Sequence, residues 1–409
     1  MLGLGNGLIT IPTSGHFTNG KSLVLDGTGD YVRIEDNAAF RGHNAFSFAA
    51  WIKADSKGDY ERVIDYSSTS GNEDTKFRLL FNNAVDQAIY AKIELASGSG
   101  YSITDSTAFP TGEWVHYVVT YDKDGGTPRL KLYKNGNTTP VATSNAEDSG
   151  LSNTVAGPIV IGAQLYGPGN YWDGNIDEVA IWNTALDADA VAAVYNSGKP
   201  FDLNSGKGNY DNSSALVGYW RMFDKVAADN DEVLAGTSKG IIHDAHNPGL
   251  GPELLTASEP LTSHLTALGL NTAAIEDGAY KVTYGGSVNG FTLKLQDGSG
   301  LLSTDLTIGE WYKVTSDWKL VGTSGDKITA RVFAGGSWNG LEGLFVEHGN
   351  DFVRKTIYFK SSHTTNDNLS VQNNLSTGET VYLKNVSIRK LNGYPGWANA
   401  DATSSTDTP

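Results

Sequence analysis

The stretch Gly174-Asn-Ile-Asp-Glu-Val-Ala-Ile-Trp182 is followed directly by Asn183-Thr-Ala-Leu-Asp-Ala-Asp-Ala-Val-Ala-Ala-Val-Tyr-Asn-Ser-Gly198. Its first half alternates as a β-strand does, which places Asp177 on the same face as Val179 and Ile181. If that aliphatic face is the core face, the carboxylate of Asp177 is taken out of water. An ionised group in such a place needs backbone donors, a cationic partner or a metal ion.

The second half of the stretch predicts one short helix. Asp187 is a good N-cap, and Leu186 and Val191 can form a hydrophobic staple across it. Gly198 can end the helix in the left-handed conformation that glycine adopts easily. No other segment has comparable helical periodicity, so this helix is expected to follow a series of strands.

Composition extends this prediction to the whole chain. The 409 residues include 48 Gly, 19 Tyr, 14 Phe and 9 Trp, which is typical of short strands joined by tight turns. Turn signals such as Asp26-Gly27 and Lys134-Asn-Gly-Asn137 separate the strand-like runs. The length indicates two or three domains. We therefore predict an all-β fold of two tandem antiparallel jelly-roll sandwiches, with one short helix closing the first.

Charge and cysteine content exclude several classes of function. The formal net charge is −16 with a pI near 4.9, so neither nucleic acid nor an anionic membrane surface is expected as a partner. The chain has no cysteine, which removes disulfides, thiolate metal sites and cysteine nucleophiles. No apolar run is long enough to insert in a membrane, and residues 1–12 lack the basic region of a secretory signal.

The chain divides into five parts by pattern and composition. We expect a lead-in or docking segment, a first sandwich, an irregular connector, a second sandwich and a flexible tail, at residues 1–19, 20–200, 201–252, 253–392 and 393–409.

Residues 20–200 resemble the laminin-G-like, concanavalin A-type jelly roll. The segments that carry the resemblance are Ser22-Leu-Val-Leu-Asp-Gly-Thr-Gly-Asp-Tyr-Val32, Phe46-Ser-Phe-Ala-Ala-Trp-Ile-Lys53, Trp114-Val-His-Tyr-Val-Val-Thr-Tyr-Asp122, Leu130-Lys-Leu-Tyr-Lys-Asn-Gly136 and Gly174–Leu186. Five ordered motifs make this a specific match.

This first resemblance implies a structural calcium ion. In that group an aspartate of the closing strand often binds Ca²⁺, and the matching position is Asp177. Asp26 and Asp30 of the turn Asp-Gly-Thr-Gly-Asp would be its side-chain partners. The alternative is that Asp177 accepts backbone N–H bonds, while Asp26 and Asp30 only form the turn.

Residues 253–391 resemble family 4/9 carbohydrate-binding modules more loosely. The carriers are Glu253-Leu-Leu-Thr256, Gly309-Glu-Trp-Tyr-Lys-Val-Thr315 and Thr380-Val-Tyr-Leu-Lys-Asn-Val-Ser-Ile388. Similar short sequence segments also occur in β-sandwiches that have a purely structural role.

The pairing of these two domain types resembles virion proteins of tailed bacteriophages. It implies a capsid decoration, fibre or tail-associated adhesin on the particle that binds host-surface glycans. Its partners would be other virion proteins and sister subunits in a homo-oligomer. The alternative is a bacterial secreted or cell-surface carbohydrate-binding protein, and a degenerate glycoside hydrolase or lyase ranks below both.

Aromatic side chains are the candidates for glycan contact, because sugar rings stack on flat exposed aromatic rings. Tyr166 and Trp338 lie in Gly-rich loops, and Tyr171 and Trp172 are less clear because a large aromatic there is often core. Trp311 and the other strand tryptophans favour a core role. Loop aromatics can equally serve a protein interface.

No catalytic motif is recognisable, so we predict that the chain is not an enzyme. It lacks the Glu-x-Asp-x-x-Glu strand of sandwich glucanases and the Gly-x-Ser-x-Gly nucleophile elbow. His243-Asp-Ala-His246 lies in an irregular segment, where no helix would align both rings on a metal.

Overall fold

The computed structural model describes residues 19–409 except for several segments. The residues outside the description are 1–18, 68–74, 83–87, 155–156, 165–168, 223–240, 243, 248–249, 256–264, 268–270, 287–290, 295–305, 323–326, 335–336, 339–343, 362–367, 374 and 399–402. The predicted docking segment 1–19 therefore lies almost entirely outside the described residues.

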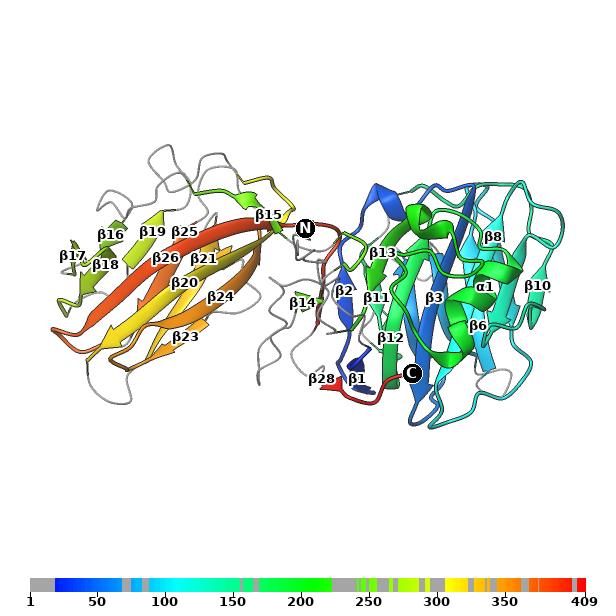
Figure 1. The fold of residues 1–409 in the computed structure, drawn as a ribbon, viewed down its shortest axis with the longest axis horizontal. Coiled ribbons are helices and arrows are strands. Elements are labelled where there is room, and N and C mark those ends of the chain that lie inside the picture. Colours follow the sequence, from blue (N-terminus) through cyan, green and yellow to red (C-terminus); the bar gives the residue numbers. More distant parts are fainter. Residues whose placement is uncertain are drawn as a thin grey trace, which may run out of the picture.

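The first sandwich consists of two antiparallel eight-stranded sheets (Figure 1). The first sheet runs in the order β10 (Ala142–Ser144), β9 (Leu130–Lys134), β8 (Val115–Asp122), β3 (Ala45–Ala54), β12 (Asp173–Trp182), β1 (Ser22–Asp26) and β28 (Thr403–Ser405), with β13 (Leu216–Trp220) also on β12. The second runs β14 (Ile241–Ile242), β27 (Gly396–Ala398), β2 (Val32–Ile34), β11 (Ile159–Ile161), β4 (Arg62–Ser67), β5 (Thr75–Asn82), β6 (Ala88–Glu94) and β7 (Gly100–Thr104).

The side chains of strand β3 point alternately to the two faces of the first sheet, and both faces are covered. Phe46, Phe48 and Ile52 point into the core between the sheets, which is the largest apolar cluster of the described residues. Ala49 points the other way, into a second apolar cluster that covers the outer face. Because both faces of β3 are covered, its ten residues are almost all buried.

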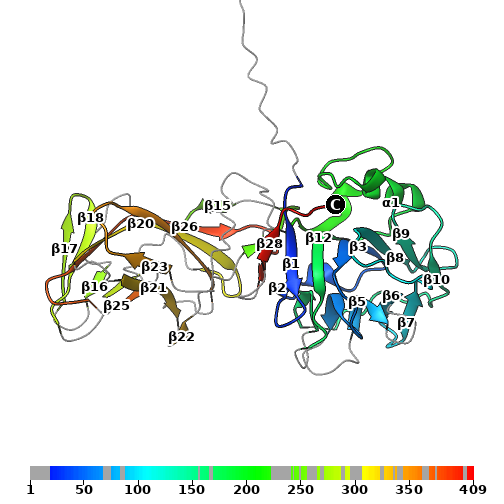
Figure 2. The ribbon, with the colours of Figure 1, turned by 90° about the horizontal axis from the view of Figure 1, so that it is seen from below.

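The outer face of the first sheet is covered by the short helix α1 (Ala188–Tyr195) and the segment after it (Figure 2). Asp187 is the N-cap, and its carboxylate accepts from the N–H of Ala190 at 2.8 Å, as predicted. The helix ends earlier than the sequence indicated. Asn196, with φ of 48°, is the left-handed C-cap, and Gly198 lies in a following turn of 3₁₀-helix, η2 (Asn196–Gly198). Two further 3₁₀ turns are η1 (Ala38–Phe40) and η3 (Asn212–Ala215).

The boundaries predicted for the connector and the tail are wrong. Strands β13 and β14 of the connector pair with β12 and β27 of the first sandwich, whereas β15 at its end pairs with β26 of the second. The tail is not flexible where it is described: β27 pairs with β2 and β14, and β28 pairs with β1 (Figures 1 and 2). The polar composition of the tail misled the prediction, because backbone pairing with an open strand edge requires no apolar side chain.

The second sandwich pairs two six-stranded antiparallel sheets around its own core. One sheet runs β17 (Thr272–Glu276), β18 (Ala279–Thr283), β26 (Thr380–Leu391), β20 (Trp311–Val321) and β24 (Val353–Lys360), with β15 (Leu250–Glu253) on β26. The other runs β16 (Leu265–Ala267), β19 (Phe291–Lys294), β25 (Asn368–Asn373), β21 (Lys327–Ala334) and β22 (Ser337–Trp338), with β23 (Leu344–Glu347) on β21.

The observed architecture confirms the predicted fold class. The described residues form antiparallel sheets with one α-helix, arranged as tandem sandwiches. That helix has eight residues, and within the described part of the chain no helix has the length and apolar character needed to cross a membrane.

Candidate functional site

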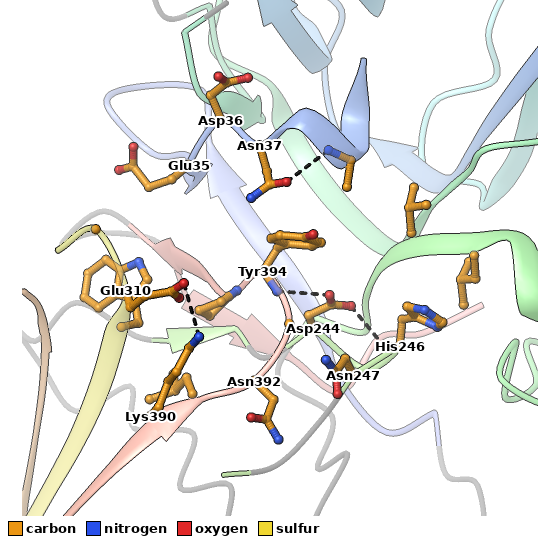
Figure 3. Close-up of a pocket in the computed structure, with 18 of the residues that line it drawn as sticks. Glu35, Asp36, Asn37, Asp244, His246, Asn247, Glu310, Lys390, Asn392 and Tyr394 are labelled. Atoms are coloured by element: carbon orange, nitrogen blue, oxygen red, sulfur yellow. Dashed lines mark hydrogen bonds and ion pairs between the residues drawn. The ribbon is translucent and has the colours of Figure 1, made fainter. Parts of the chain in front are cut away.

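The main cavity of the described structure lies where the two sandwiches meet, and its volume is about 820 Å³ (Figure 3). Its walls come from the end of β2, the start of β13 and the start of β20. Its floor is the chain that returns from β26 to β27. The lining residues that carry polar or aromatic groups are Glu35, Asp36, Asn37, Asp244, His246, Asn247, Glu310, Trp311, Lys390, Asn392 and Tyr394. We call this cavity the inter-sandwich cleft.

Asp244 anchors the floor of the cleft. It is 1% exposed, and its two carboxylate oxygens accept from the backbone N–H groups of Tyr219 at 2.9 Å, His246 at 3.0 Å and Tyr394 at 3.1 Å. Burial raises the pKa of this carboxyl to about 6, although the three N–H donors act to lower it. Asp244 therefore holds three separate segments together and is not available to a ligand.

Ion pairs join the two walls. Glu35, which follows β2, binds Arg33 of its own strand at 3.1 Å and Lys360 of β24 in the second sandwich at 3.3 Å. Burial acts to raise the pKa of Glu35, but the hydrogen bonds and charges of Arg33 and Lys360 outweigh it and hold the pKa below its ordinary value. Glu310 and Lys390 form a second pair at 3.1 Å on the β20 side.

Two aromatic side chains line the cleft. Trp311 is the first residue of β20 and is 7% exposed, and its indole Nε1 has no hydrogen-bond partner among the described residues. Tyr394 packs edge-on against Phe40 with ring centroids 4.8 Å apart, while its carbonyl accepts from the indole N–H of Trp220 at 2.8 Å. The indole N–H of Trp311 is thus a buried donor at the edge of the cleft without a partner in the described structure, while the ring packs with Tyr358 and Leu391.

Amide side chains complete the polar lining. Asn37 uses its carbonyl oxygen to cap η1 through the N–H of Ala39 at 3.0 Å. Asn247 and Asn392 make no side-chain hydrogen bond with any residue that the structure describes. His246 contacts Asn204 at 3.2 Å, and burial lowers the pKa of its imidazole, which favours the neutral ring.

A β-bulge changes the position predicted for Asp177. Strand β12 pairs Asp177 with Trp51 and Ala180 with Ala49, so β12 has one extra residue there, and Glu178 has φ of 49°. Ile176 and Val179 both point into the inner core. Asp177 therefore lies on the outer face with Trp51, and not on the face of Val179 as alternation indicated.

Asp177 and the next residue, Glu178, contact polar groups of β12 and of the connector. Asp177 is fully buried, and its Oδ1 accepts from the N–H of Glu178 at 2.8 Å. The carboxylate of Glu178 accepts from the hydroxyl of Tyr219 and pairs with Arg221 at 3.2 Å. These contacts tie the closing strand to β13 and the residue that follows it.

The three aspartates predicted to bind calcium are not brought together. Asp26 pairs with Asp173, which stands four residues before Asp177, a separation of about 13 Å along a strand. Asp26 accepts from the N–H and hydroxyl of Thr28 at 2.8 and 2.9 Å, and Asp30 accepts from the N–H of Asp26 at 3.3 Å. Over the described residues, no three acidic or histidine side chains gather around a possible metal position. These donors do not fit a single Ca²⁺ ion, and calcium at Asp177 stays a prediction.

Of the four aromatic residues predicted for glycan contact, the two whose side chains the structure describes, Tyr171 and Trp172, do not line the cleft. Trp172 is fully buried, stacks on Phe81 with centroids 4.8 Å apart and belongs to the core of the first sandwich, so its assignment to a binding surface is wrong. Its size and the short loop before β12 drive it inward. Tyr171 is half-buried. Tyr166 lies outside the described residues, as does the side chain of Trp338, whose backbone belongs to β22.

The residues that do form the cleft were only partly visible in the sequence. Trp311 stood out as a strand tryptophan and was assigned to the core, which its low exposure explains. The segment from His243 to His246 stood out as a weak metal motif, and its Asp244 and His246 line the cleft. Glu310 and Lys390 gave no signal, because only the register of β20 and β26 brings them together.

Residues 26–192 match the Laminin_G_3 family. That family is described as the concanavalin A-like lectin/glucanases superfamily, and the match covers most of the first sandwich. The first of the two resemblances stated above is thereby supported for the domain. Among curated proteins, none matches the chain.

Several solved structures are similar to parts of this chain at low identity. A native heptameric SAP-like pentraxin from Limulus polyphemus is 17% identical with a TM-score of 0.36, over 48% of this chain and 88% of the pentraxin. A putative carbohydrate binding protein from Bacteroides ovatus is 20% identical with a TM-score of 0.39, over 55% of each chain. The CBM40 of a Ruminococcus gnavus IT-sialidase, bound to α2,3-sialyllactose, is 16% identical with a TM-score of 0.34, over 44% of this chain and 99% of the module. At these scores the likeness has no bearing on ligand or activity.

Proposed function

We propose that this protein binds carbohydrate without cleaving it, and that it holds the glycan in the inter-sandwich cleft. The observation that carries the proposal is Trp311, a buried tryptophan on the cleft wall whose indole N–H has no partner among the described residues. The lectin/glucanase description of the family matched by residues 26–192 supports the same class of ligand.

The chemistry of the lining matches the needs of a sugar. A pyranose presents an apolar ring face, which packs on an aromatic side chain, and a rim of hydroxyl groups that donate and accept hydrogen bonds. Tyr394 and the edge of Trp311 provide aromatic surface, and Asn247 and Asn392 provide amides with both donor and acceptor atoms. A volume of about 820 Å³ is large enough for a short oligosaccharide.

The carboxylates of the cleft favour binding over hydrolysis. A glycosidase needs one carboxylic acid that donates a proton and one carboxylate that attacks or activates water. Asp244 is saturated by three backbone N–H groups, Glu310 is paired with Lys390, and Glu35 is paired across the cleft. We therefore expect no release of reducing ends when the purified protein is incubated with soluble polysaccharides.

The cleft can be tested by calorimetry after a glycan array has identified a ligand. Trp311→Phe keeps most of the apolar surface but removes the N–H donor, and Asn247→Ala with Asn392→Ala removes the free amides. Each variant is expected to bind at least about tenfold more weakly, the equivalent of one or two lost hydrogen bonds.

The matched control for these variants is Asn137→Ala, an amide in a distant hairpin that caps the N–H of Thr139. It should bind the ligand as the unaltered protein does. Full affinity in both cleft variants, with both proteins folded, would contradict the cleft as the binding site.

For the setting of this binding, we propose a tailed-phage virion that displays the protein towards host-surface glycans as a decoration, fibre or tail-associated adhesin. The likeness of the tandem arrangement to such virion proteins supports this setting. A bacterial secreted or cell-surface protein is the second candidate, and the concanavalin A-like match favours it equally. Gold-labelled antibody in electron microscopy decides between them, because it would mark either purified particles or the bacterial surface.

Weak sugar sites on a particle gain strength through several copies that bind together. The proposal therefore includes assembly with sister subunits and attachment to other virion proteins. Light scattering of the purified full chain measures the first part: a trimer or larger closed oligomer supports an appendage, and a monomer favours the secreted protein or a decoration that assembles only on the particle.

A further inference from the structure

A second surface of interest lies on the second sandwich, away from its core. In the sheet β17-β18-β26-β20-β24, alternate side chains such as Val381 and Leu320 point into the core. The residues between them form the opposite face. There, Lys281 of β18, Tyr382 of β26 and Lys319 of β20 are direct cross-strand neighbours. This row is the start of a surface that we call the basic aromatic face.

Ammonium groups converge on aromatic rings along this face. The Nζ of Lys319 lies 4.2 Å from the ring centroid of Tyr382 and 5.0 Å from that of Phe352. The Nζ of Lys384 lies 4.0 Å from the same Phe352 ring. Two positive charges thus approach the ring of Phe352. Each ammonium group is attracted to the ring, but the two ammonium groups repel each other.

The nearby carboxylates do not relieve that repulsion. Asp317 stands directly opposite Lys384 in the register, yet its oxygens bind Arg354 at 3.0 Å and the amide of Asn385 at 2.6 Å. Neither Lys319 nor Lys384 forms an ion pair with any residue that the structure describes.

The second carboxylate of the row is also engaged. Glu276 binds Lys281 at 2.5 Å and the hydroxyl of Tyr382 at 2.9 Å. Both carboxylates next to the two lysines are therefore already occupied by other groups.

This surplus of positive charge contrasts with the chain as a whole, whose formal net charge is −16. Among the described residues of the face, Lys281, Arg354 and Arg389 are held in ion pairs by Glu276, Asp317 and Glu253. Lys319 and Lys384 are two further cations on the same face. A local excess of cations in an acidic protein indicates a surface that receives an anion.

We propose that the basic aromatic face binds an acidic polysaccharide, one that carries sulfate or carboxylate groups. An anionic substituent would lie between the ammonium groups of Lys319 and Lys384, with a sugar ring beside the edges of Phe352 and Tyr382. This inference extends the proposed function to a second site with a different ligand charge, and it rests on that function only for the ligand being a sugar. An acidic polysaccharide is proposed because its negative charge complements the two lysines. The alternative occupant is the acidic surface of a second copy of this chain.

The test uses the full chain, dextran sulfate and unmodified dextran of the same length, at about 150 mM salt so that weak non-specific attraction is screened. Dextran sulfate should bind, and Lys319→Gln with Lys384→Gln should weaken that binding by about tenfold or more. Lys319→Arg with Lys384→Arg keeps both charges and should retain binding. Lys207→Gln is the matched control, because Lys207 lies 5.0 Å from the ring of Phe201 on the first sandwich.

The outcomes separate this proposal from the others. Unchanged dextran sulfate affinity in the folded glutamine variant overturns it. So does equally tight binding of polyglutamate, which would show a patch for any polyanion, or a loss of self-association as the variant's sole change, which would assign the face to a second copy. Asn247→Ala with Asn392→Ala should leave dextran sulfate binding intact, so that failure of the cleft and failure of this face are distinguishable.

Discussion

The carboxylate of Asp244 accepts a hydrogen bond from the backbone N–H of Tyr394 at 3.1 Å, although the two residues stand 150 positions apart in the chain. Asp244 belongs to the segment before the second sandwich, and Tyr394 belongs to the segment after it. The bond therefore joins the entry and the exit of the second sandwich at one point on the floor of the inter-sandwich cleft (Figure 3).

Replacing this junction should destabilise the protein. Asp244→Ala leaves three N–H donors without an acceptor, that of Tyr219 buried and those of His246 and Tyr394 partly buried. We expect a loss of about 2 kcal/mol or more in the free energy of unfolding, since an unsatisfied buried donor costs about 1–3 kcal/mol. Urea denaturation measures the loss. Asp211→Ala, at an exposed carboxylate without a capping bond, should change stability by less than about 0.5 kcal/mol. Similar midpoints for the two variants would refute the role of Asp244.

Stability should fall between pH 5 and pH 8 because of Glu61. Burial, with the nearby Asp173 carboxylate, raises the pKa of Glu61 from 4.5 to about 7. The folded state thus favours the protonated form, so its contribution is fully present below pH 4.5 and is lost as the pH rises through about 7. Glu61→Gln should flatten this part of the urea-midpoint profile, whereas Glu113→Gln at an exposed position should not. Asp244, with a pKa of about 6, adds a similar fall at lower pH in both variants.

Trp172→Ala separates a core role from a binding role. Because Trp172 is fully buried against Phe81, the substitution should cost about 3–5 kcal/mol of stability. The fraction that remains folded should bind glycan with unchanged affinity in calorimetry. If the Trp172→Ala protein stays stable but loses affinity for the glycan, Trp172 belongs to a binding surface and not to the core.

Removal of residues 403–409 should expose the edge of β1. Strand β28 covers that edge, and Asp407 fastens it through the indole N–H of Trp114 at 3.0 Å and an ion pair with Lys53. We expect the truncated chain to remain folded but to self-associate in light scattering, since an unpaired strand edge accepts another strand. Asp211→Asn, at an exposed carboxylate of the connector, is the control and should behave as the full chain does.

Calcium should have little effect on thermal unfolding. Asp177, Asp26 and Asp30 do not converge, so neither about 1 mM calcium nor a chelator is expected to move the midpoint by more than about 1 °C. A rise of several degrees with calcium, abolished in Asp177→Asn, would show that this aspartate does hold the ion.

Local patterns predicted much of the fold. Alternation identified the closing strand β12, and the capping residue Asp187 marked the start of the helix. The candidate site was predicted less well: of the nominated aromatics, the two with described side chains, Tyr171 and Trp172, do not line the cleft, and Trp311, which does, was assigned to the core. A tryptophan at a domain junction has the same local sequence pattern as one in the interior.

The sequence by itself determined the class of fold, the number of sandwiches and which strand faces are apolar, because side chains alternate along a strand whatever it pairs with. Tertiary structure decided the rest. The bulge at Glu178 turned Asp177 to the outer face, and pairing of polar Thr403–Ser405 with β1 brought the chain end back to the first sandwich. Both depend on backbone hydrogen bonds between distant segments. Such bonds use the same N–H and C=O groups in every residue, so the side-chain pattern does not record them.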